Sequence, residues 1–364
     1  MRTPKCAVLA LLVAAALLAP LTLVAGEISG NSYKVLTPIT QGNLTIFPVV
    51  SASTHDTAGF LTLDEGLRSG EVVVTEAGRV AGLVRRPGPW ENQFRRDGAQ
   101  VNQLVLVNNS KRPLLLLAGE IVTGGKQDRV IGKDRIVPAG GDPIDLSVFC
   151  VEPGRWTESS ANFKTSVGGF MAQPSVRGSA MAAKNQQQVW DEVRRSNQEA
   201  VAVTSPSTGS PGILTGTTSY ARVMGDATVQ SQVDKIAAPI SQNYNDVLRD
   251  LRERNAVGVV VAVGGKIIWA DLFASAALLQ RYWPKLVRSY AAEALVSRAS
   301  KGGTVGVAEA DRFLRELAGT HEVTDSQPGV YRHTEVTGAG FRVFELTSLL
   351  PGTGFDLHLA KMSN

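Results

Sequence analysis

The feature that most limits the fold of this chain is a series of short apolar or alternating segments before residue 151, each bounded by Gly, Pro, Asn or Asp. Segments of this length between turn residues are typical of antiparallel β-structure. The chain has 364 residues, 43% of them hydrophobic, which is enough for a substantial core. We therefore expect a β-rich, sandwich-like first half. The predicted strands are residues 44–50, 71–75, 101–107, 114–122, 128–137 and 144–151.

Residues 156–255 are expected to form a helical region. Apolar residues recur at spacings of three or four from Val229 to Leu251, which indicates an amphipathic helix. Pro239 lies within this pattern and predicts a kink or two consecutive helices. A further helix is expected over residues 176–200. Residues 203–219, rich in Ser, Thr, Pro and Gly, are predicted to be a linker or a long loop over a site.

Residues 256–364 return to a mixed pattern. Gly264 and Gly265 separate two apolar segments and predict a hairpin with a two-residue turn. A long helix, a shorter helix over residues 307–318 and late strands near 329–335, 341–346 and 355–359 follow. We therefore expect an α+β fold in which the β-rich region 27–155 packs with the helical middle and a C-terminal mixed α/β region. Late strands are expected to complete the early sheet, so that residues 27–364 form one compact unit.

The first 26 residues have the pattern of a secretory signal peptide. Arg2 and Lys5 precede an apolar stretch that ends at the small residues Ala25 and Gly26. The alternative is an uncleaved membrane anchor, but Pro20 interrupts the stretch, which is marginal for a span of about 20 residues. The sequence therefore predicts a secreted or periplasmic protein.

Cleavage changes the charge and thiol content of the chain. The formal charge falls from +4 to +2, because 35 basic residues then face 33 acidic ones. A charge so close to zero, without basic blocks, argues against nucleic acid as a partner. Cys150 becomes the only cysteine, so no internal disulfide is expected. No second long apolar stretch follows, so we expect no stable membrane span after cleavage.

The densest group of polar residues follows the apolar segment that begins at residue 114. A glycine-rich turn beside a lysine allows backbone amides and a cation to bind an anion. This turn is not a P-loop, because no Ser or Thr follows the lysine. The alternative is a β-hairpin with a solvated charged face. The candidate ligand-binding residues here are Gly125, Lys126, Gln127 and Arg129, and Asp128 is a candidate catalytic residue.

Glu120 lies in the apolar segment 114–122, which we expect to be one strand covered on both faces. A carboxylate there requires a partner, because burying an unpaired charge is costly. Arg129 or Lys126 across the hairpin is the expected partner. Glu120 is therefore either a catalytic acid or base, or half of a buried ion pair.

A second polar group surrounds Cys150. A lone cysteine is commonly a small buried hydrophobe, and we expect no nucleophile here. Glu152 is a candidate catalytic residue on the same side of the strand. Arg155 and Trp156 are suited to binding an anionic or planar ligand, or alternatively to covering a sheet edge. Asp271, before the long helix, is either its N-cap or a ligand-binding residue.

The sequence contains no recognisable metal or cofactor motif. Its four histidines are isolated, and it lacks paired Cys-x-x-Cys ligands, so no metal site is predicted. A nucleophile elbow and a dinucleotide-binding glycine fingerprint are also absent. The cofactor, if the protein is an enzyme, stays unidentified at this level.

Several of these segments together resemble a known family. Residues 114–130, 137–140, 148–152 and 154–156, with 265–273 and 282–286, are similar to the ARG and rhodanese-phosphatase-superfamily-associated protein domain, an uncharacterised, mainly bacterial family. The resemblance covers roughly residues 44–299 and implies one structural unit. The family name implies association with ADP-ribosylglycohydrolase and phosphatase-like proteins, and hence a nucleotide-like or phosphorylated ligand. It also implies a pocket shared by Glu120, Lys126, Gln127, Asp128, Arg129, Glu152, Arg155, Trp156 and Asp271.

Two functions follow from these observations. The first is an exported soluble domain that binds a small anionic ligand, with enzymatic activity left open. The alternative is a structural or protein-interaction module of the cell envelope, in which the same polar residues form a buried ion-pair network. An open cavity lined by these residues favours the first, and a packed, fully paired cluster favours the second.

The signal-peptide hypothesis predicts a specific mature product. The exported protein is expected to begin near Glu27 and to carry one thiol, that of Cys150. The intact mass of secreted material and a thiol titration of the denatured chain measure both properties. A product that retains Met1, or a reduced chain without a free thiol, would contradict the hypothesis.

Overall fold

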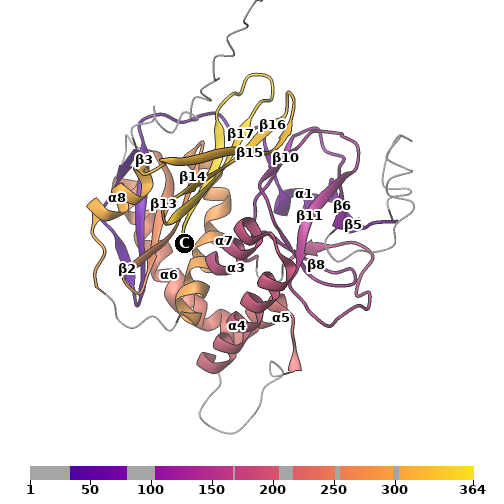
Figure 1. The fold of residues 1–364 in the computed structure, drawn as a ribbon, viewed down its shortest axis with the longest axis horizontal. Helices are drawn as coiled ribbons and strands as arrows, with labels where there is room; N and C mark the ends of the chain where they lie inside the picture. The colour runs from indigo at the N-terminus through magenta and orange to yellow at the C-terminus, as the bar shows by residue number, and fades with distance from the viewer. Residues whose placement is uncertain (1–32, 80–102, 167–168, 205–215, 251–254, 298–302) are drawn as a thin grey trace, which may run out of the picture.

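The α+β architecture that the sequence predicts is confirmed. The computed structural model describes residues 33–79, 103–166, 169–204, 216–250, 255–297 and 303–364. Within this part, helices pack against strands that form three β-sheets (Figure 1). The predicted signal peptide and residues 205–215 of the predicted loop lie outside the described residues.

The largest sheet joins the two ends of the described chain. It is antiparallel, and strands from the last third pair with strands before residue 52, so the late strands do complete the early sheet. Gly264 and Gly265 have φ angles of 59° and 78° and form the predicted two-residue turn. The strand order is β1 (Tyr33–Val35), β3 (Leu44–Ser51), β13 (Asn255–Val263), β14 (Lys266–Phe273), β18 (Asp356–Ser363), β17 (Phe341–Ser348), β16 (Tyr331–Gly338) and β15 (Gly319–Gln327), with β2 (Ile39–Gln41) paired to β3.

Two smaller sheets enclose a second apolar core, to which Leu104, Leu116 and Val148 belong. Strand β16 of the large sheet contacts β10 (Arg135–Val137), which belongs to one of these sheets (Figure 1). One small sheet has the order β10 (Arg135–Val137), β7 (Leu114–Leu116) and β4 (Leu61–Thr62). The other has the order β12 (Lys164–Thr165), β8 (Ile121–Thr123), β9 (Arg129–Ile131), β11 (Ile144–Cys150), β6 (Gln103–Asn108) and β5 (Val72–Glu76).

The prediction of one strand over residues 114–122 is wrong. The segment divides into β7 and β8, and the chain turns between them at Gly119, whose φ is +92°. A Cβ atom at Gly119 would lie 2.4 Å from Cγ of Arg177. The turn therefore provides the space that the Arg177 side chain occupies. The segment 128–137 likewise divides into two strands, β9 and β10.

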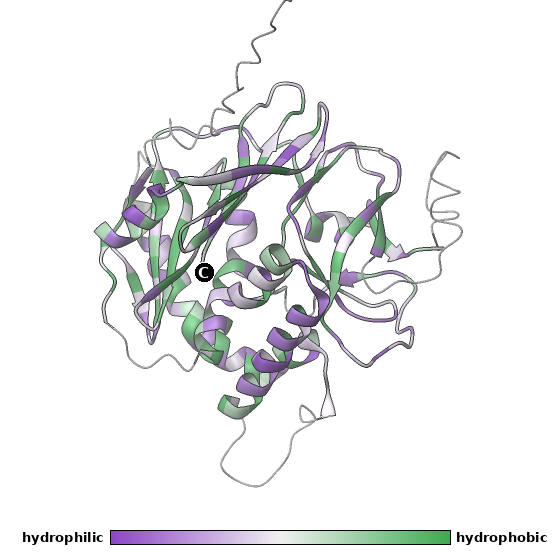
Figure 2. Ribbon diagram, in the orientation of Figure 1, coloured by the Kyte–Doolittle hydropathy of each residue, from purple (hydrophilic) through white to green (hydrophobic). Residues whose placement is uncertain are grey.

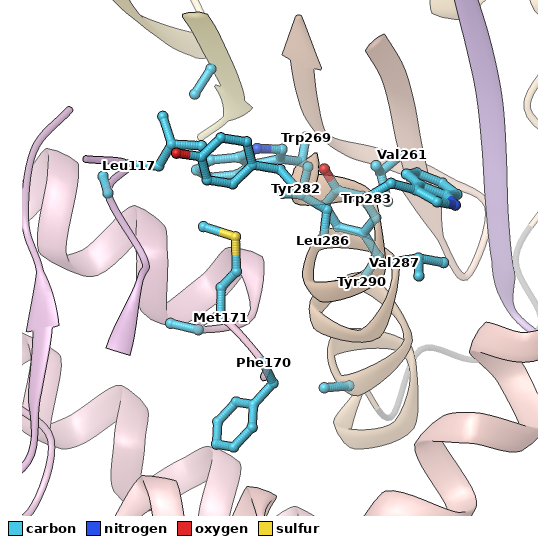
Figure 3. Close-up of a cluster of buried hydrophobic side chains, with 14 of the residues drawn as sticks. Leu117, Phe170, Met171, Val261, Trp269, Tyr282, Trp283, Leu286, Val287 and Tyr290 are labelled. Atoms are coloured by element: carbon cyan, nitrogen blue, oxygen red, sulfur yellow. The ribbon is translucent and has the colours of Figure 1, made fainter. Parts of the chain in front are cut away.

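Helices cover both faces of the large sheet. α6 (Ala227–Asp250) and α7 (Ala276–Val296) pack on one face, and α8 (Val307–Arg315) packs on the other through Ala310 and Leu314. Figure 2 shows hydrophobic residues concentrated in the large sheet and the helices beside it. Aromatic residues of α7, including Tyr282 and Tyr290, lie between the sheet and the segment around Met171 (Figure 3).

The helical predictions hold in part. Pro239 lies inside α6, which continues past it as one helix, so of the two alternatives expected there, a kink or two consecutive helices, the second is wrong. The segment 176–200 is interrupted at Lys184, which has a φ of 51°. Here α3 (Pro174–Gly178) and a π-helical turn (Ser179–Ala183) precede α4 (Gln186–Thr204). Two short helices were not predicted, α1 (Leu63–Ser69) and α5 (Tyr220–Met224).

Five buried polar side chains join the small sheets, the large sheet and the helices. Arg177 of α3 forms two hydrogen bonds with the Asp271 carboxylate of β14, at 3.0 and 3.1 Å. His358 of β18 lies between two carboxylates: Nε2 is 3.1 Å from Asp271, and Nδ1 is 2.5 Å from Asp134. Tyr290 of α7 also donates to Asp271. We call Asp134, Arg177, Asp271, Tyr290 and His358 the central node.

The central node is balanced in charge and closed to solvent. No side-chain surface is exposed on any of its four charged residues, which are Asp134, Arg177, Asp271 and His358. Burial disfavours a charged imidazole, but Asp134 and Asp271 outweigh it and raise the pKa of His358 to about 9. Arg177 and His358 hold the pKa of Asp271 below its usual range, against the effect of burial. Two cations therefore neutralise two carboxylates, as buried charges require.

The raised pKa of His358 predicts a loss of stability in alkaline solution. The charged imidazole stabilises the fold fully below pH 6.5, the ordinary pKa of histidine, and this contribution disappears as pH rises through about 9. At about 1.4 kcal/mol per pKa unit, the free energy of unfolding is expected to fall by roughly 3 kcal/mol over this interval. Denaturant titrations at several pH values measure this change in the free energy of unfolding.

His321→Gln is the matched control, because His321 is exposed on β15. This variant is expected to keep the alkaline loss, whereas His358→Gln is expected to lack it. Should His358→Gln fail to fold, an NMR titration of the wild-type imidazoles gives the same information. A His358 resonance that loses its proton below pH 7 would contradict the prediction.

Candidate functional site

The predicted glycine-rich turn is the loop between β8 and β9. Val122 pairs with Arg129 at its base. Gly124 and Gly125 have φ angles of 134° and 50°, and a Cβ atom on either would lie within 2.4 Å of Ser160 Oγ or of the Phe163 ring. Only glycine fits at both positions. The loop is a hairpin, but Gln127, Asp128 and Arg129 are buried, so its polar residues do not form a solvated face.

Asp128 is held in one orientation by this loop. Its Oδ1 accepts a hydrogen bond from the Gly124 amide at 3.1 Å, and its Oδ2 accepts one from Ser219 Oγ at 3.0 Å. Burial and the neighbouring carboxylate of Glu152 raise the pKa of Asp128 above its ordinary value. A fixed carboxyl group with a raised pKa has the properties of a general acid or base.

Glu152 and Arg155 hold the loop against the end of β11. Arg155 forms ion pairs with Glu152 at 2.5 Å and with Asp128 at 3.4 Å, and it donates to the Gly125 carbonyl at 3.0 Å. Glu152 Oε2 accepts from the Asp128 amide at 3.1 Å, and Gln127 donates to the Glu152 carbonyl. The structure therefore brings Gly125, Gln127, Asp128, Glu152 and Arg155 together.

An open cleft of about 740 Å³ lies beside this group. Such a volume is within the usual range for small-molecule sites. Asp128 and Arg155 line it on the hairpin side, and Arg222 of α5 lines it on the other. Lys164 of β12 adds a third cation. The remaining polar lining residues are Thr123, Ser159, Ser160, Thr217 and Asp226.

The walls of the cleft are fixed by the backbone. The amide of Tyr220 donates to the Val151 carbonyl at 2.9 Å, and the amide of Ser159 donates to the Gly125 carbonyl at 2.8 Å. The two walls are therefore anchored to β11 and to the glycine-rich loop. Asp226 accepts from the amide of Thr228 at 2.8 Å, so its carboxylate stabilises the first turn of α6.

Lys126 and Trp156 lie near each other on the surface. Trp156 is 44% exposed, and the Lys126 ammonium is 5.0 Å from the centre of its ring. The Lys126 amide donates to Glu76. Neither residue is among those that line the cleft, although Trp156 directly follows Arg155 in the chain.

Arg129 and Cys150 lie in the interior, and neither lines the cleft. Burial lowers the pKa of the Arg129 guanidinium, and burial raises the pKa of the Cys150 thiol. The Cys150 side chain has no exposed surface, and its sulfur accepts a hydrogen bond from the Glu152 amide. A protonated, inaccessible thiol is unsuited to nucleophilic attack.

Glu120 belongs to a separate buried cluster. Its partner is Lys285 of α7, which corrects the expectation of Arg129 or Lys126. Lys285 also lies 2.9 Å from Asp64 of α1, and the second Glu120 oxygen accepts from the Leu117 amide at 2.8 Å. Burial raises the pKa of Glu120, while the two carboxylates raise the pKa of Lys285 despite its burial.

Asp271 is not the N-cap of the long helix. It lies within β14, and Ser275 caps α7 by accepting a hydrogen bond from the Leu278 amide at 3.0 Å. Asp271 is instead the centre of the central node. Within the described residues it forms no hydrogen bond or ion pair with Asp128, Glu152 or Arg155. The predicted residues are therefore not one pocket: besides the surface pair of Lys126 and Trp156 and the interior Arg129, they divide among the cleft group, the Glu120 cluster and the central node.

Some residues of the cleft, and some partners in the buried clusters, were not predicted from the sequence. Lys164 and Arg222 line the cleft as isolated cations without a motif. Ser219 fixes Asp128 from 91 residues away in the chain. In the buried clusters, the missed partners of Glu120 and Asp271 are Lys285, Arg177 and His358. Their pairing depends on contacts between distant segments, which periodicity does not reveal.

Two features are absent from the part of the chain that the structure describes. No group of three or more His, Cys, Asp or Glu side chains there is placed to hold a metal ion. None of the helices in these same residues has the length and apolar content that crossing a membrane requires.

Comparison with known proteins places the chain by family alone. The model of the ARG and Rhodanese-Phosphatase-superfamily-associated Protein domain matches residues 32–360. No curated protein and no solved structure matches.

The contacts of Glu120 predict a structural role for its charge. Glu120→Gln is expected to lower the free energy of unfolding by about 3–5 kcal/mol, because it leaves the buried Lys285 ammonium with only half of its charge compensation. Glu335→Gln is the control, since Glu335 pairs with the half-exposed Lys184 and should cost under about 1 kcal/mol. Chemical denaturation at neutral pH measures both. Equal stability of Glu120→Gln and wild type would favour a catalytic Glu120.

Proposed function

The chain belongs to the ARG and Rhodanese-Phosphatase-superfamily-associated Protein domain family, and we propose that it is an exported domain that binds a small anionic ligand in the cleft beside Asp128. The observation that carries this proposal is an open cleft bordered by the cations Arg155, Lys164 and Arg222. Cations beside a glycine-rich loop are suited to phosphate and carboxylate groups.

The three cations are not equivalent. Arg155 is neutralised by Glu152 and Asp128, and its guanidinium bonds to the loop carbonyls. Lys164 and Arg222 form no ion pair within the described chain, and both side chains are exposed. An anion in the cleft is therefore expected to be bound by Lys164 and Arg222, with Arg155 as part of the rigid wall.

Asp128 is the candidate for chemistry in this site. It lines the cleft, it is held by Gly124 and Ser219, and its pKa is raised by burial and by Glu152. If the domain is an enzyme, Asp128 is suited to transfer a proton to or from the bound ligand. Glu152 does not line the cleft and acts as a positioning residue, because it binds the Asp128 amide and Arg155.

The alternative function, an envelope interaction module, fits other parts of the molecule. Glu120 and Asp271 belong to packed clusters of paired charges, which is the arrangement expected of structural residues. The cleft differs, because it is open and two of its cations lack a partner in the described residues. We therefore assign the buried clusters to stability and the cleft to ligand binding.

Export is part of the proposal and rests on the leader alone. Arg2, Lys5 and the apolar stretch before Gly26 are its support. An exported domain meets its ligand in the periplasm or outside the cell. Since nucleotide-derived metabolites are mostly cytoplasmic, simpler phosphates and carboxylates are the first ligands to test.

A thermal-shift assay with inorganic phosphate, sulfate, citrate and a sugar phosphate tests ligand binding. A ligand that binds only the folded protein raises its melting temperature in proportion to RT ln(1 + [L]/Kd). Wild-type protein is expected to be stabilised by at least one of these anions. Arg222→Ala is expected to weaken the affinity for that anion at least tenfold, as loss of a charged hydrogen bond of about 1.5–3 kcal/mol implies.

Arg194→Ala is the control for this variant. Arg194 is an exposed helical arginine like Arg222, but it pairs with Asp191 on α4 and does not line the cleft. Its substitution is expected to leave the anion response unchanged. The proposal fails if no anion stabilises the wild type, or if Arg194→Ala weakens the response as much as Arg222→Ala does.

A further inference from the structure

The hydroxyl groups in the cleft beside Asp128 are oriented by the backbone. Four of the described residues that line this cleft are Ser or Thr, and three of them donate their hydroxyl proton to a backbone carbonyl. A hydroxyl has one proton and two lone pairs, so each of the three is available to a ligand only as an acceptor. These hydrogen bonds run from Ser159 to Gly125 at 3.3 Å, from Ser160 to Asn162 at 2.8 Å and from Thr123 to Thr165 at 3.4 Å.

Asp128 adds a charged acceptor to the same side of the cleft. Its two oxygens accept hydrogen bonds from Gly124 and Ser219, and an ionised carboxylate has further lone pairs but no proton to donate. The Asp128 side chain keeps 9% of its surface exposed, Ser159 is exposed and Ser160 is half-buried. We call the following residues the acceptor wall: Thr123, Asp128, Ser159 and Ser160.

The terminal nitrogens of Arg155, which borders this wall, are already bonded within the protein. Its Nη1 donates to the carbonyls of Gly125 and Thr157, at 3.0 and 2.8 Å. Its Nη2 donates to the Gly124 carbonyl at 3.4 Å and forms the ion pair with Glu152. A ligand on this side of the cleft is therefore expected to donate hydrogen bonds rather than to accept them.

The two exposed cations of the cleft are carried by segments that are bonded to the acceptor wall. Ser219 Oγ accepts a hydrogen bond from the Arg222 amide at 3.1 Å and donates one to Asp128 at 3.0 Å. Lys164 lies opposite Thr123 where β12 pairs with β8. One small molecule can therefore contact a cation and the acceptor wall at the same time.

A bare inorganic anion is complementary to the cations alone. Sulfate has no proton to donate at neutral pH and hydrogen phosphate has one, so most of the acceptor wall would lose water without gaining a partner. The cleft volume, about 740 Å³, is also typical of larger ligands. Hydroxyl groups supply the missing donors and suit the neutral oxygens of Ser159 and Ser160. An ammonium group instead favours a carboxylate, and Asp128 already pairs with Arg155.

We propose that the ligand of this cleft is a small anion that bears hydroxyl groups, namely a polyol phosphate or a polyol carboxylate. Its anionic group binds Lys164 and Arg222. Its hydroxyl groups donate to Asp128, Ser159 and Ser160. This inference rests on the function proposed above, and it adds the chemistry of the part of the ligand that is not charged.

Two pairs of ligands test the inference, because the members of each pair share an anionic group and a three-carbon chain. Isothermal titration calorimetry of the full chain compares α-glycerol phosphate with n-propyl phosphate, and glycerate with propionate. In at least one pair, the wild type is expected to bind the hydroxylated member about tenfold more tightly, as one hydrogen bond to a charged acceptor implies. The pair that binds identifies the anionic group. Arg222→Ala is expected to weaken the binding of both members equally.

Asp128→Asn tests the charged acceptor. The amide replaces one carboxylate oxygen by a donor and removes the charge, so the ratio of the two affinities within the binding pair is expected to fall about threefold. Asp191→Asn is the matched control, because Asp191 is exposed on α4 and does not line the cleft, and this variant is expected to keep the wild-type ratio. Should Asp128→Asn fail to fold, Ser160→Ala takes its place, with an expected fall of about twofold.

The inference and the function on which it rests fail on different results. If no member of either pair binds the wild type, the anion site itself is refuted, and the inference with it. If both members of a pair bind equally tightly, the anion site stands and the inference is overturned. It is also overturned if aminopropyl phosphate binds more tightly than α-glycerol phosphate, because the donor is then an ammonium group. The same holds if folded Asp128→Asn keeps the ratio measured for Asp191→Asn.

Discussion

The contact on which the fold most depends is the paired hydrogen bond between Arg177 and Asp271, in the centre of the central node. Around it, Asp134 comes from the turn before β10, His358 from β18 and Tyr290 from α7. Buried charges are tolerated only when each has its partner, so the segments must meet in one arrangement. The node thus defines how the small sheets, the large sheet and the helices fit together. Removing these charges from water costs free energy, and their mutual attraction offsets that cost only when the segments meet in this arrangement.

Charge therefore has two different uses in this molecule. In the central node and the Glu120 cluster, acids and bases neutralise one another away from solvent. Beside Asp128, the same residue types border an open cleft, where Lys164 and Arg222 remain exposed. The distinction rests on burial and pairing rather than on residue type. The sequence does not reveal burial or pairing, so the residues predicted for one site include both buried structural charges and residues of the cleft.

Local patterns predicted much of the fold. Turn residues around apolar segments indicated β3, β5, β6 and β11, and Gly264-Gly265 indicated the β13–β14 hairpin. β15 was missed because its residues are mostly polar and exposed at the sheet edge, where no apolar alternation is required. In the candidate site, the sequence indicated Asp128, Glu152 and Arg155, because each belongs to a dense polar motif beside an apolar segment. It did not indicate Ser219 or Arg222, which reach the cleft only through tertiary packing.

The position of β18 in the large sheet has a consequence for the order in which the molecule assembles. β18 is the last of the described strands in chain order, yet it lies between β14 and β17 in the interior of the sheet. During synthesis, Asp134 and Asp271 emerge well before His358 is available to them. Contacts between such distant segments slow folding, and the earlier strands stay exposed in the meantime. The large sheet can thus close only after β18 has been synthesised, so its assembly is a late step in the folding of this chain.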